Sequence, residues 1–425
     1  MSNYYPTNPK ISFSFPIIPS FLLYTLLYFP SISLARVEAE AYSLPPPLDP
    51  APGLCPWNPT IQNLRTPACA SPDYTRKLVV PPSSPSLEWR GPEHCVNETC
   101  VFSNAAQNGG ISLITSPLHA SIIQDYAITV DGGAYPPPYY VDVIDEKGIG
   151  LRANRSVAKG EVLMVRAPTL VAQVEAIEEL EVAVRNIMYK FAIDRLPKNR
   201  RDAFMGQMGR DIHNKINTNA FQFFVHGAGE KGTRHLAAYP DIAKFNHDCR
   251  PSVHYRITDA TMTAVAARDI QQGEKLTISY VDIFLPSRKR KDRIRSWGFE
   301  CACALCQGPK NETTASDKRL RRIEQLKNDL NNFQEMKVTA EIGAEYAALH
   351  AEEGLHAHLG SAYTRAALNF ALFGDEERAR EYALKAVVEL GIEKGPDSGD
   401  ARAMKGLAED PRGHWTWGKR RAVGK

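Results

Sequence analysis

Short apolar runs separated by turn residues fill the middle of the chain. YYVDVI at 139–144 alternates apolar and polar positions, and EVLMVRAPTLV at 161–171 repeats this strand-like character after Lys159-Gly160. Further runs of this kind are NAFQFFVH, VHYRIT, MTAVAAR and KLTISYV. Residues 173–215 instead mix acidic and apolar residues at spacings of three and four, which predicts a helical insert. We therefore expect an α+β fold, a β-rich domain of small curved sheets with one helical insert, rather than a parallel α/β sheet.

Helical periodicity dominates the chain from residue 311 to residue 425. RLRRIEQLKNDLNNFQEM is one helical run, and AYTRAALNFALFGDEERAREYALKAVVEL is a second, interrupted by the turn at 373–375. Small residues would let antiparallel helices pack closely, namely Ala366, Ala367, Ala379, Ala383 and Ala386. This pattern predicts an α-helical, tetratricopeptide-like C-terminal region. A helical bundle that packs on the β-rich domain without a binding role of its own is the alternative.

The N-terminal part of the chain differs from the rest. The apolar run ISFSFPIIPSFLLYTLLYFPSISLA ends in Ser33 and Ala35 at the spacing that a signal peptidase reads, which predicts a signal peptide over 1–35. The stretch from Pro19 to Pro30 is too short for a stable membrane span. An anchor, an unstructured apolar tail or a mis-assigned start are the alternatives. Residues 36–138 are expected to form a Pro-rich, Cys-containing N-terminal segment.

Charge gives little reason to expect a nucleic-acid partner. The chain has 51 basic and 48 acidic residues and a net charge of +3. Basic residues cluster at 287–296 and 317–322, and we interpret both runs as solvated helix faces, with nucleic-acid patches or localisation signals as alternatives. No direct nucleic-acid binding is therefore expected.

The eight cysteines fall into two sets of four. The first set is Cys55, Cys69, Cys95 and Cys100, and the second is Cys249, Cys301, Cys303 and Cys306. The four cysteines of the first set, in the first quarter of the chain, could form two disulfides. In the second set, the C-x-C-x2-C segment could supply three ligands to a zinc ion. The fourth ligand must then come from elsewhere, and a disulfide with one thiol left over is the metal-free alternative. The two chemistries prefer opposite redox compartments.

Four segments occur together in one order: KGIGL at 147–151, KFNHDCRPSVHY at 244–255, GEKLTISYVD at 273–282 and GFECACALC at 298–306. Together they resemble the SET-domain protein-lysine methyltransferases. The helical insert and helical C-terminus resemble the split-SET branch that includes the SET and MYND proteins and their fungal relatives. The insert has no cysteine and a single histidine, so the MYND module is not expected.

This resemblance implies a domain organisation and a set of site residues. It predicts a SET domain over 139–285 with its insert at 173–215, a post-SET zinc region over 286–310, and the helical region over 311–425. The implied cofactor is S-adenosylmethionine, bound by Lys147, Gly148, Gly150, Asn219, Asn246, His247 and Phe299. The implied structural zinc is held by Cys249, Cys301, Cys303 and Cys306. Tyr280 would be the catalytic tyrosine and Trp297 would line the lysine channel.

Each motif also has a plainer interpretation. The G-x-G segment is compatible with an ordinary β-turn. Asn246 and His247 are compatible with two structural residues whose polar groups are hydrogen-bonded. Tyr280 is compatible with a core tyrosine whose hydroxyl is hydrogen-bonded. Two positions depart from the family pattern, Asp248 where serine is usual and Ser252 where asparagine is usual. They bear on substrate preference and rate and remove none of the groups given a chemical role.

The resemblance implies methyl transfer to a lysine side chain of a protein tail or loop, with histones among the candidate substrates. The alternative is a SET-fold binding or scaffold protein that lacks useful catalysis and recruits partners through its helical C-terminus. Compartment stays open at this point. The N-terminus and the early cysteines favour secretion, whereas the thiolate zinc site and the cofactor favour nucleus or cytoplasm.

Overall fold

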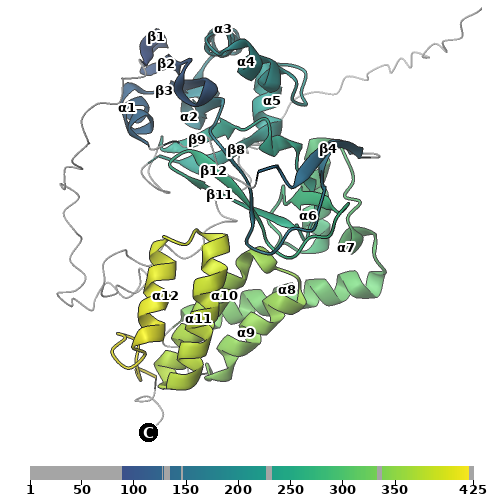
Figure 1. Ribbon diagram of the computed structural model, residues 1–425, viewed down its shortest axis with the longest axis vertical. Coiled ribbons are helices and arrows are strands. Elements are labelled where there is room, and N and C mark those ends of the chain that lie inside the picture. Colours follow the sequence, from purple (N-terminus) through teal and green to yellow (C-terminus); the bar gives the residue numbers. More distant parts are fainter. Residues whose placement is uncertain are drawn as a thin grey trace, which may run out of the picture.

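The computed structural model describes residues 89–126, 128, 135–144, 147–225, 232–332 and 337–420. A strand-rich part with three small sheets lies above a helical region formed by the C-terminal residues (Figure 1). The predicted α+β class is confirmed. The predicted signal peptide, Cys55 and Cys69 lie outside the described residues.

The largest sheet has six strands in the order β1-β2-β3-β7-β9-β8. Their bounds are Arg90–Val96, Thr99–Asn104, Ile111–Thr115, Leu170–Gln173, Arg234–Ala238 and Ala220–Phe224. The parallel pair β3 and β7 joins Leu113 to Val171. Residues 90–115 therefore fold as one sheet with the β-rich domain, whereas the sequence interpretation ended the N-terminal segment at 138. Strands β2 and β3 are buried on both faces, so they lack the alternation that marks a half-buried strand.

Two smaller sheets complete the strand-rich part. One has the order β10-β13-β5-β4, with bounds Asn246–His247, Lys275–Ile278, Gly148–Ala153 and Tyr139–Ile144. The other has the order β11-β12-β6, with bounds Val253–Thr258, Thr261–Ala266 and Val162–Arg166. The strand-like runs of the sequence thus form strands close to where the pattern places them.

Helices cover the six-stranded sheet. The insert folds into α2, α3, α4 and α5, with bounds Val174–Glu179, Val182–Asp194, Lys198–Met205 and Ile212–Asn219. Tyr189 and Phe204, both fully buried, pack these helices on the sheet. Helix α1, Pro117–Asp125, begins at Ser116, whose hydroxyl accepts the His119 backbone N–H.

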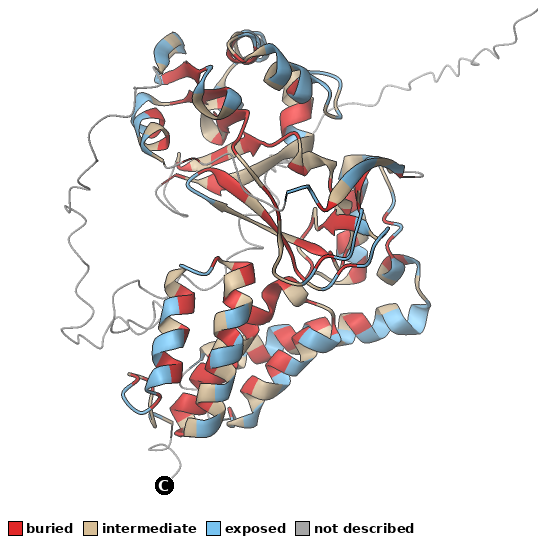
Figure 2. Ribbon diagram, in the orientation of Figure 1, coloured by how far each residue is buried: buried red, intermediate tan, exposed pale blue. Residues whose placement is uncertain are grey.

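The helical region begins after two short elements that border the site, α6 (Ser287–Ile294) and α7 (Ala304–Gln307). It contains α8, α9, α10, α11 and α12, with bounds Lys310–Asn331, Glu341–Glu352, Leu359–Phe373, Glu376–Glu393 and Gly399–Glu409. Buried faces of successive helices turn toward one another (Figure 2). A Cβ on Gly343 would lie 2.9 Å from the Ala366 Cα, so small residues permit this approach as predicted. Whether the region is tetratricopeptide-like stays a prediction.

The β1–β2 hairpin carries the one disulfide of the described residues, Cys95–Cys100. Asn97 lies exposed in its turn with a φ of 52°, whereas Thr99, the last residue of the sequon Asn97-Glu98-Thr99, is buried. Among the residues that the structure describes, no helix is long and apolar enough to cross a membrane. Secretion stays a prediction, because the N-terminal run on which it depends lies outside these residues.

Candidate active site and its cysteine cluster

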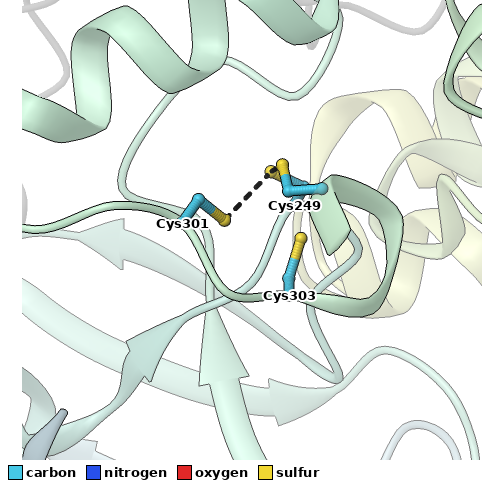
Figure 3. Close-up of side chains that lie close together, drawn as sticks. Cys249, Cys301 and Cys303 are labelled. Atoms are coloured by element: carbon cyan, nitrogen blue, oxygen red, sulfur yellow. Dashed lines mark hydrogen bonds between the residues drawn. The ribbon is translucent and has the colours of Figure 1, made fainter. Parts of the chain in front are cut away.

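Four cysteines from two distant segments meet beside the strand β10. The ligand atoms of Cys249, Cys301, Cys303 and Cys306 all lie within 4.8 Å of one another. We call this set the cysteine cluster. All four side chains are buried, and those drawn in Figure 3 point toward a common centre. Within the described residues this is the one group of metal-ligating side chains so arranged, and none of its members forms a disulfide.

The spacing of the sulfurs fits a tetrahedral zinc site. Zinc binds thiolates at about 2.3 Å, so the sulfurs of such a site lie about 3.8 Å apart. The Cys249 Sγ lies 3.9 Å from that of Cys301 and 3.6 Å from that of Cys306. Thiol hydrogen bonds from Cys249 lower the pKa of Cys303 and Cys306, whereas the same network raises the pKa of Cys249 itself. The four residues would hold a structural zinc, which favours the thiolate form of all of them.

Three aromatic side chains pack directly on the cysteine cluster: Tyr280, Trp297 and Phe299. The Tyr280 ring centroid lies 5.8 Å from that of Trp297 and 6.4 Å from that of Phe299. The Trp297 Nε1–H donates to the Thr218 carbonyl at 3.2 Å, which ties this segment to the end of α5. The cluster therefore positions the aromatic wall of the site.

His247 connects the cysteine cluster to Tyr280. The Tyr280 backbone N–H donates to His247 Nδ1 at 3.1 Å, so the proton of a neutral imidazole lies on Nε2. That Nε2 lies 3.4 Å from the Cys249 Sγ, within reach for an N–H···S hydrogen bond. The parallel pairing of β10 with β13 aligns His247 with Ile278, two residues before Tyr280. His247 thus contacts both Cys249 of the cysteine cluster and the backbone of Tyr280.

Gly150 of β5 packs against the side chains of Asn246 and Ile144, which leave no room for a Cβ there. A Cβ there would lie 2.3 Å from the Asn246 Nδ2 and 2.6 Å from the Ile144 Cγ1. The Asn246 Nδ2 donates to the Ile149 carbonyl at 3.1 Å. Gly148 has a φ of 71° and open space beside it, and the Lys147 Nζ lies 3.4 Å from the His247 carbonyl. These residues leave open space beside Gly148, which we call the recess.

Tyr280 is half-buried, with its hydroxyl oriented by the backbone. The hydroxyl donates to the Phe245 carbonyl at 2.7 Å, and burial raises the pKa of Tyr280 to about 12. The hydroxyl therefore stays protonated near neutral pH. Its oxygen lone pairs remain available to accept a hydrogen bond from a group in the cavity.

Apart from Gly150, the proposed cofactor, catalytic and channel residues all line one cavity of 1930 Å³. They are Lys147, Gly148, Asn219, Asn246, His247, Tyr280, Trp297 and Phe299. Gly150 lies behind this wall, in contact with Asn246. Asn219 lies at the rim, but its amide donates to the Met208 and Lys215 carbonyls, so that amide is already used to hold the loop before α5.

The cavity has two walls that the sequence interpretation did not assign. Phe221 of β8 packs edge-on against Tyr255 of β11, with ring centroids 5.0 Å apart. The end of α11 and the segment before α10 supply Ala357, His358, Glu393 and Lys394. The helical region therefore borders the cavity. A single sequence holds no sign of this, because the wall forms between segments about one hundred residues apart.

The two departures from the family pattern both keep hydrogen bonds near the site. Ser252 accepts the Thr277 backbone N–H at 3.1 Å, which joins it to β13. Asp248 accepts the Arg250 backbone N–H at 2.8 Å, and burial raises its pKa to about 6. Neither side chain fills the recess beside Gly148.

Comparison with known proteins fits this geometry. The family model of the SET domain matches residues 148–281. This chain contains a SET domain. The histone-lysine N-methyltransferase set5 of Schizosaccharomyces pombe is 25% identical over 293 residues, which are 65% of this chain and 85% of that protein.

Two human relatives match over shorter stretches of the chain. The histone-lysine N-methyltransferase SMYD3 is 33% identical over 103 residues, 22% of this chain and 24% of that protein. The N-lysine methyltransferase SMYD2 is 31% identical over 111 residues, 26% of this chain and 23% of that protein. The chain thus spans most of the fission yeast relative and about a quarter of the human ones. The resemblance to SET-domain lysine methyltransferases predicted from the motifs is confirmed, whereas the split-SET branch and the absence of a MYND module stay predictions.

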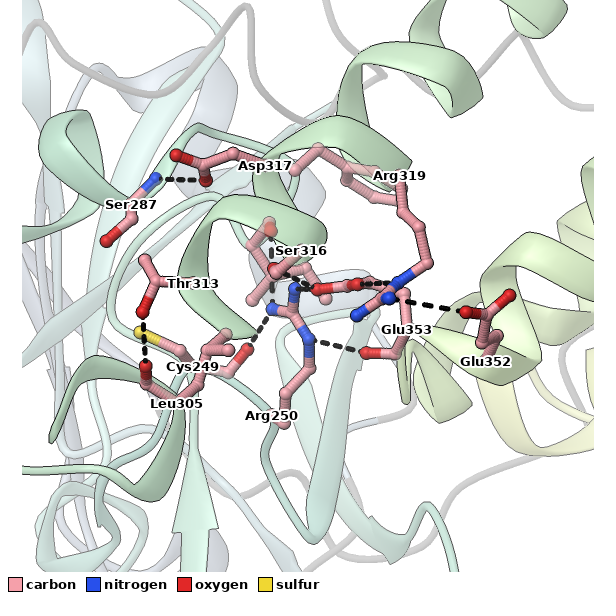
Figure 4. A network of polar contacts seen from close by, with 12 residues as sticks. Cys249, Arg250, Ser287, Leu305, Thr313, Ser316, Asp317, Arg319, Glu352 and Glu353 are labelled. Atoms are coloured by element: carbon pink, nitrogen blue, oxygen red, sulfur yellow. Dashed lines mark hydrogen bonds and ion pairs between the residues drawn. The ribbon is translucent and has the colours of Figure 1, made fainter. Parts of the chain in front are cut away.

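A buried ionic network joins the SET domain to the helical region (Figure 4). Arg250 follows Cys249 of the cysteine cluster and forms an ion pair with Glu353, whose side chain is 1% exposed. Glu353 also accepts from Arg319 Nε at 2.6 Å and from the Ser316 hydroxyl. Sequence reasoning missed this network because Arg250 and Glu353 are 103 residues apart.

We expect Glu353→Gln to lower the free energy of unfolding by about 3 kcal/mol, since it leaves two half-buried arginines without their buried carboxylate. Burial alone would raise the pKa of Glu353, but Ser316 and the two arginines lower it below the ordinary 4.5. A depressed carboxyl pKa stabilises the fold above pH 4.5, and this contribution is lost as pH falls through the lowered pKa. Urea unfolding at pH 7 and at acidic pH measures both effects.

The matched control is Glu345→Gln, which breaks the exposed pair between Glu345 and Arg322. Exposed pairs contribute less than about 1 kcal/mol, so this variant should unfold close to wild type. Equal destabilisation by the two substitutions would contradict a special role of Glu353.

Proposed function

We propose that the SET domain transfers a methyl group from S-adenosylmethionine to a lysine side chain of a protein. The observation that carries this proposal is the position of Tyr280. Its hydroxyl, fixed on the Phe245 carbonyl, lines the same cavity as the Asn246-His247 strand and the aromatic wall of Trp297 and Phe299. The curated relatives, named as lysine methyltransferases, support the same reaction.

The recess beside Gly148 and Asn246 fits the cofactor. Because Gly150 has no side chain, the side chains of Asn246 and Ile144 fit closely there, and Phe299 would offer an aromatic face to an adenine ring. Lys147, Asn246 and His247 would hold the polar end. When bound, S-adenosylmethionine supplies the methyl group and a positive sulfonium. The cysteine cluster would hold the zinc in a structural role, since four protein ligands leave no open position.

The protein must favour the neutral form of the substrate lysine. An amine with a pKa of about 10.4 costs roughly 4–5 kcal/mol to deprotonate at pH 7. The aromatic walls of Tyr280, Trp297 and Phe299 disfavour the ammonium by excluding water. Because Tyr280 stays protonated, its oxygen would accept an N–H of the amine and orient it rather than remove its proton. Holding amine and methyl in line supplies most of the acceleration.

Cofactor binding tests this proposal against the scaffold alternative. Wild type should bind S-adenosylmethionine in calorimetry and methylate lysine peptides on an array. Gly150→Ala should weaken binding by about tenfold or more, because the new Cβ collides with the Asn246 amide.

Gly406→Ala is the control for this substitution. A Cβ at Gly406 in α12 meets no atom within 4 Å, so binding should match wild type. Absence of cofactor binding by the folded wild type would refute the methyltransferase proposal. Binding without transfer to any peptide would favour the scaffold role.

A further inference from the structure

One arginine in the cavity has no carboxylate partner. Among the described lining residues, the charged side chains near the helical region are Arg256, Glu393 and Lys394. Lys394 pairs with Asp400, and the carboxylate of Glu393 accepts the Ser361 N–H at 2.8 Å and the Ser361 hydroxyl at 2.5 Å. Arg256 donates from Nη1 to the Ile392 carbonyl at 3.1 Å and forms no ion pair with a described residue.

Half-buried arginines of the SET domain differ in this respect, and Arg200, like Arg256, donates only to backbone carbonyls among the described residues. Three other half-buried arginines each lie within 3.4 Å of a carboxylate: Arg152 with Asp142, Arg166 with Asp241, and Arg234 with Glu175. Burial lowers the pKa of Arg256, which shows that its charge is partly desolvated without an offsetting carboxylate. A guanidinium has five N–H donors, and the Ile392 carbonyl takes one of them.

The surroundings of Arg256 hold it at the cavity wall. On β11, His254 and Arg256 share one face, and His254 Nε2 lies 2.9 Å from the Glu393 carbonyl. Beyond the end of α11, Gly395 has a φ of 101°, and a Cβ there would lie 3.4 Å from the Arg256 Nε. The close backbone limits where the guanidinium can go, and its remaining donors are left for a ligand.

We propose that Arg256 selects lysine peptides that carry an aspartate or glutamate near the methylated lysine. The cavity is continuous from Tyr280 to Arg256, and its 1930 Å³ exceeds the 300–1,000 Å³ typical of small-ligand pockets. A peptide with its lysine at Tyr280 would therefore extend along β11 toward the helical region. A guanidinium accepts a carboxylate through two parallel hydrogen bonds, which gives both affinity and register. This inference rests on the proposed methyl transfer for its lysine site.

The test uses the full chain and lysine peptides in which each flanking position is in turn Glu, Gln or Lys. Methyl transfer by wild type should prefer Glu over Gln at one position by about tenfold, the size of a hydrogen bond to a charged group. In Arg256→Glu the preference should reverse toward Lys at that same position. Lys405→Glu, an equal charge change on exposed α12 outside the cavity, should keep the wild-type preference.

Peptide binding measured by fluorescence polarisation separates this inference from the proposed function. If wild type binds the acidic peptide preferentially and Arg256→Glu does not, the role of Arg256 is supported whether or not methyl transfer occurs. If transfer is then absent, only the proposed methyltransferase function is contradicted. Transfer with equal rates for Glu, Gln and Lys at every position would overturn the inference alone. So would an acidic preference that persists in Arg256→Glu.

Discussion

Replacing Cys249 by serine is expected to remove zinc and cofactor binding together. Cys249 is the one ligand of the cysteine cluster outside the 301–306 loop, and it lies three residues after Asn246 on the cofactor side. Without the Cys249 thiol, the three cysteines of the 301–306 loop would no longer be joined through zinc to the segment that follows β10. The Trp297 and Phe299 side chains would then lose their fixed positions over the cavity.

The expected loss of cofactor affinity in Cys249→Ser follows from the free energy needed to order the side chains of Trp297 and Phe299. Immobilising each costs about 0.5–1.5 kcal/mol, so binding that must order both again weakens by roughly ten- to a hundredfold. Zinc per chain is measured by elemental analysis and cofactor affinity by calorimetry. The control is the double substitution Cys95→Ser and Cys100→Ser, which removes the hairpin disulfide and should keep full zinc. Full zinc occupancy in Cys249→Ser would show that the fourth ligand lies elsewhere.

Local patterns in the sequence account for much of the fold and the site. Apolar runs located the strands from Tyr139 onward except β5, β9 and the two-residue β10, and helical spacing located the insert and the C-terminal helices. The cysteine cluster joins residues 52 positions apart, yet it could be predicted because C-x-C-x2-C is an incomplete zinc site that requires a fourth ligand. A motif that needs a further ligand thus allows a contact between distant residues to be predicted from one sequence.

Contacts without such a requirement could not be predicted. Strand β3 pairs with β7 across more than fifty residues, and its buried apolar run fits many partners. Arg250 and Glu353 are ordinary charged residues until the fold desolvates them together. Asn219 shows the reverse case, since its motif suggested a cofactor contact while the structure uses its amide to hold a loop. Motifs thus predict the position of a functional site better than they predict the hydrogen bonds that each residue of the motif forms.

Tyr280→Phe is expected to reduce methyl transfer by about a hundredfold or more while cofactor affinity stays close to that of wild type. Losing one oriented hydrogen-bonding group at a reacting centre commonly has this size of effect. The ring still packs against Trp297 and Phe299, so the cavity keeps its shape. The rate of methyl transfer is measured under single-turnover conditions with an array peptide that wild type methylates. Cofactor affinity is measured separately by calorimetry.

A matched substitution is available at Tyr239. Its buried hydroxyl donates to the Ala260 carbonyl at 2.7 Å, as that of Tyr280 does to Phe245, but it does not line the cavity. Tyr239→Phe should cost about 1 kcal/mol of stability and leave transfer intact. Equal loss of transfer in both variants would reduce Tyr280 to a packing residue.

The pH dependence of transfer separates orientation from proton removal by Tyr280. Burial raises the pKa of Tyr280 to about 12, and raising a tyrosine pKa favours its neutral form, so the hydroxyl does not ionise between pH 7 and about 10. Wild-type transfer should therefore rise with pH as the substrate amine deprotonates, and Tyr280→Phe should show the same slope at a lower rate. A slope that disappears in Tyr280→Phe would instead identify the tyrosine as the base, because the titrating group would have been removed with its hydroxyl.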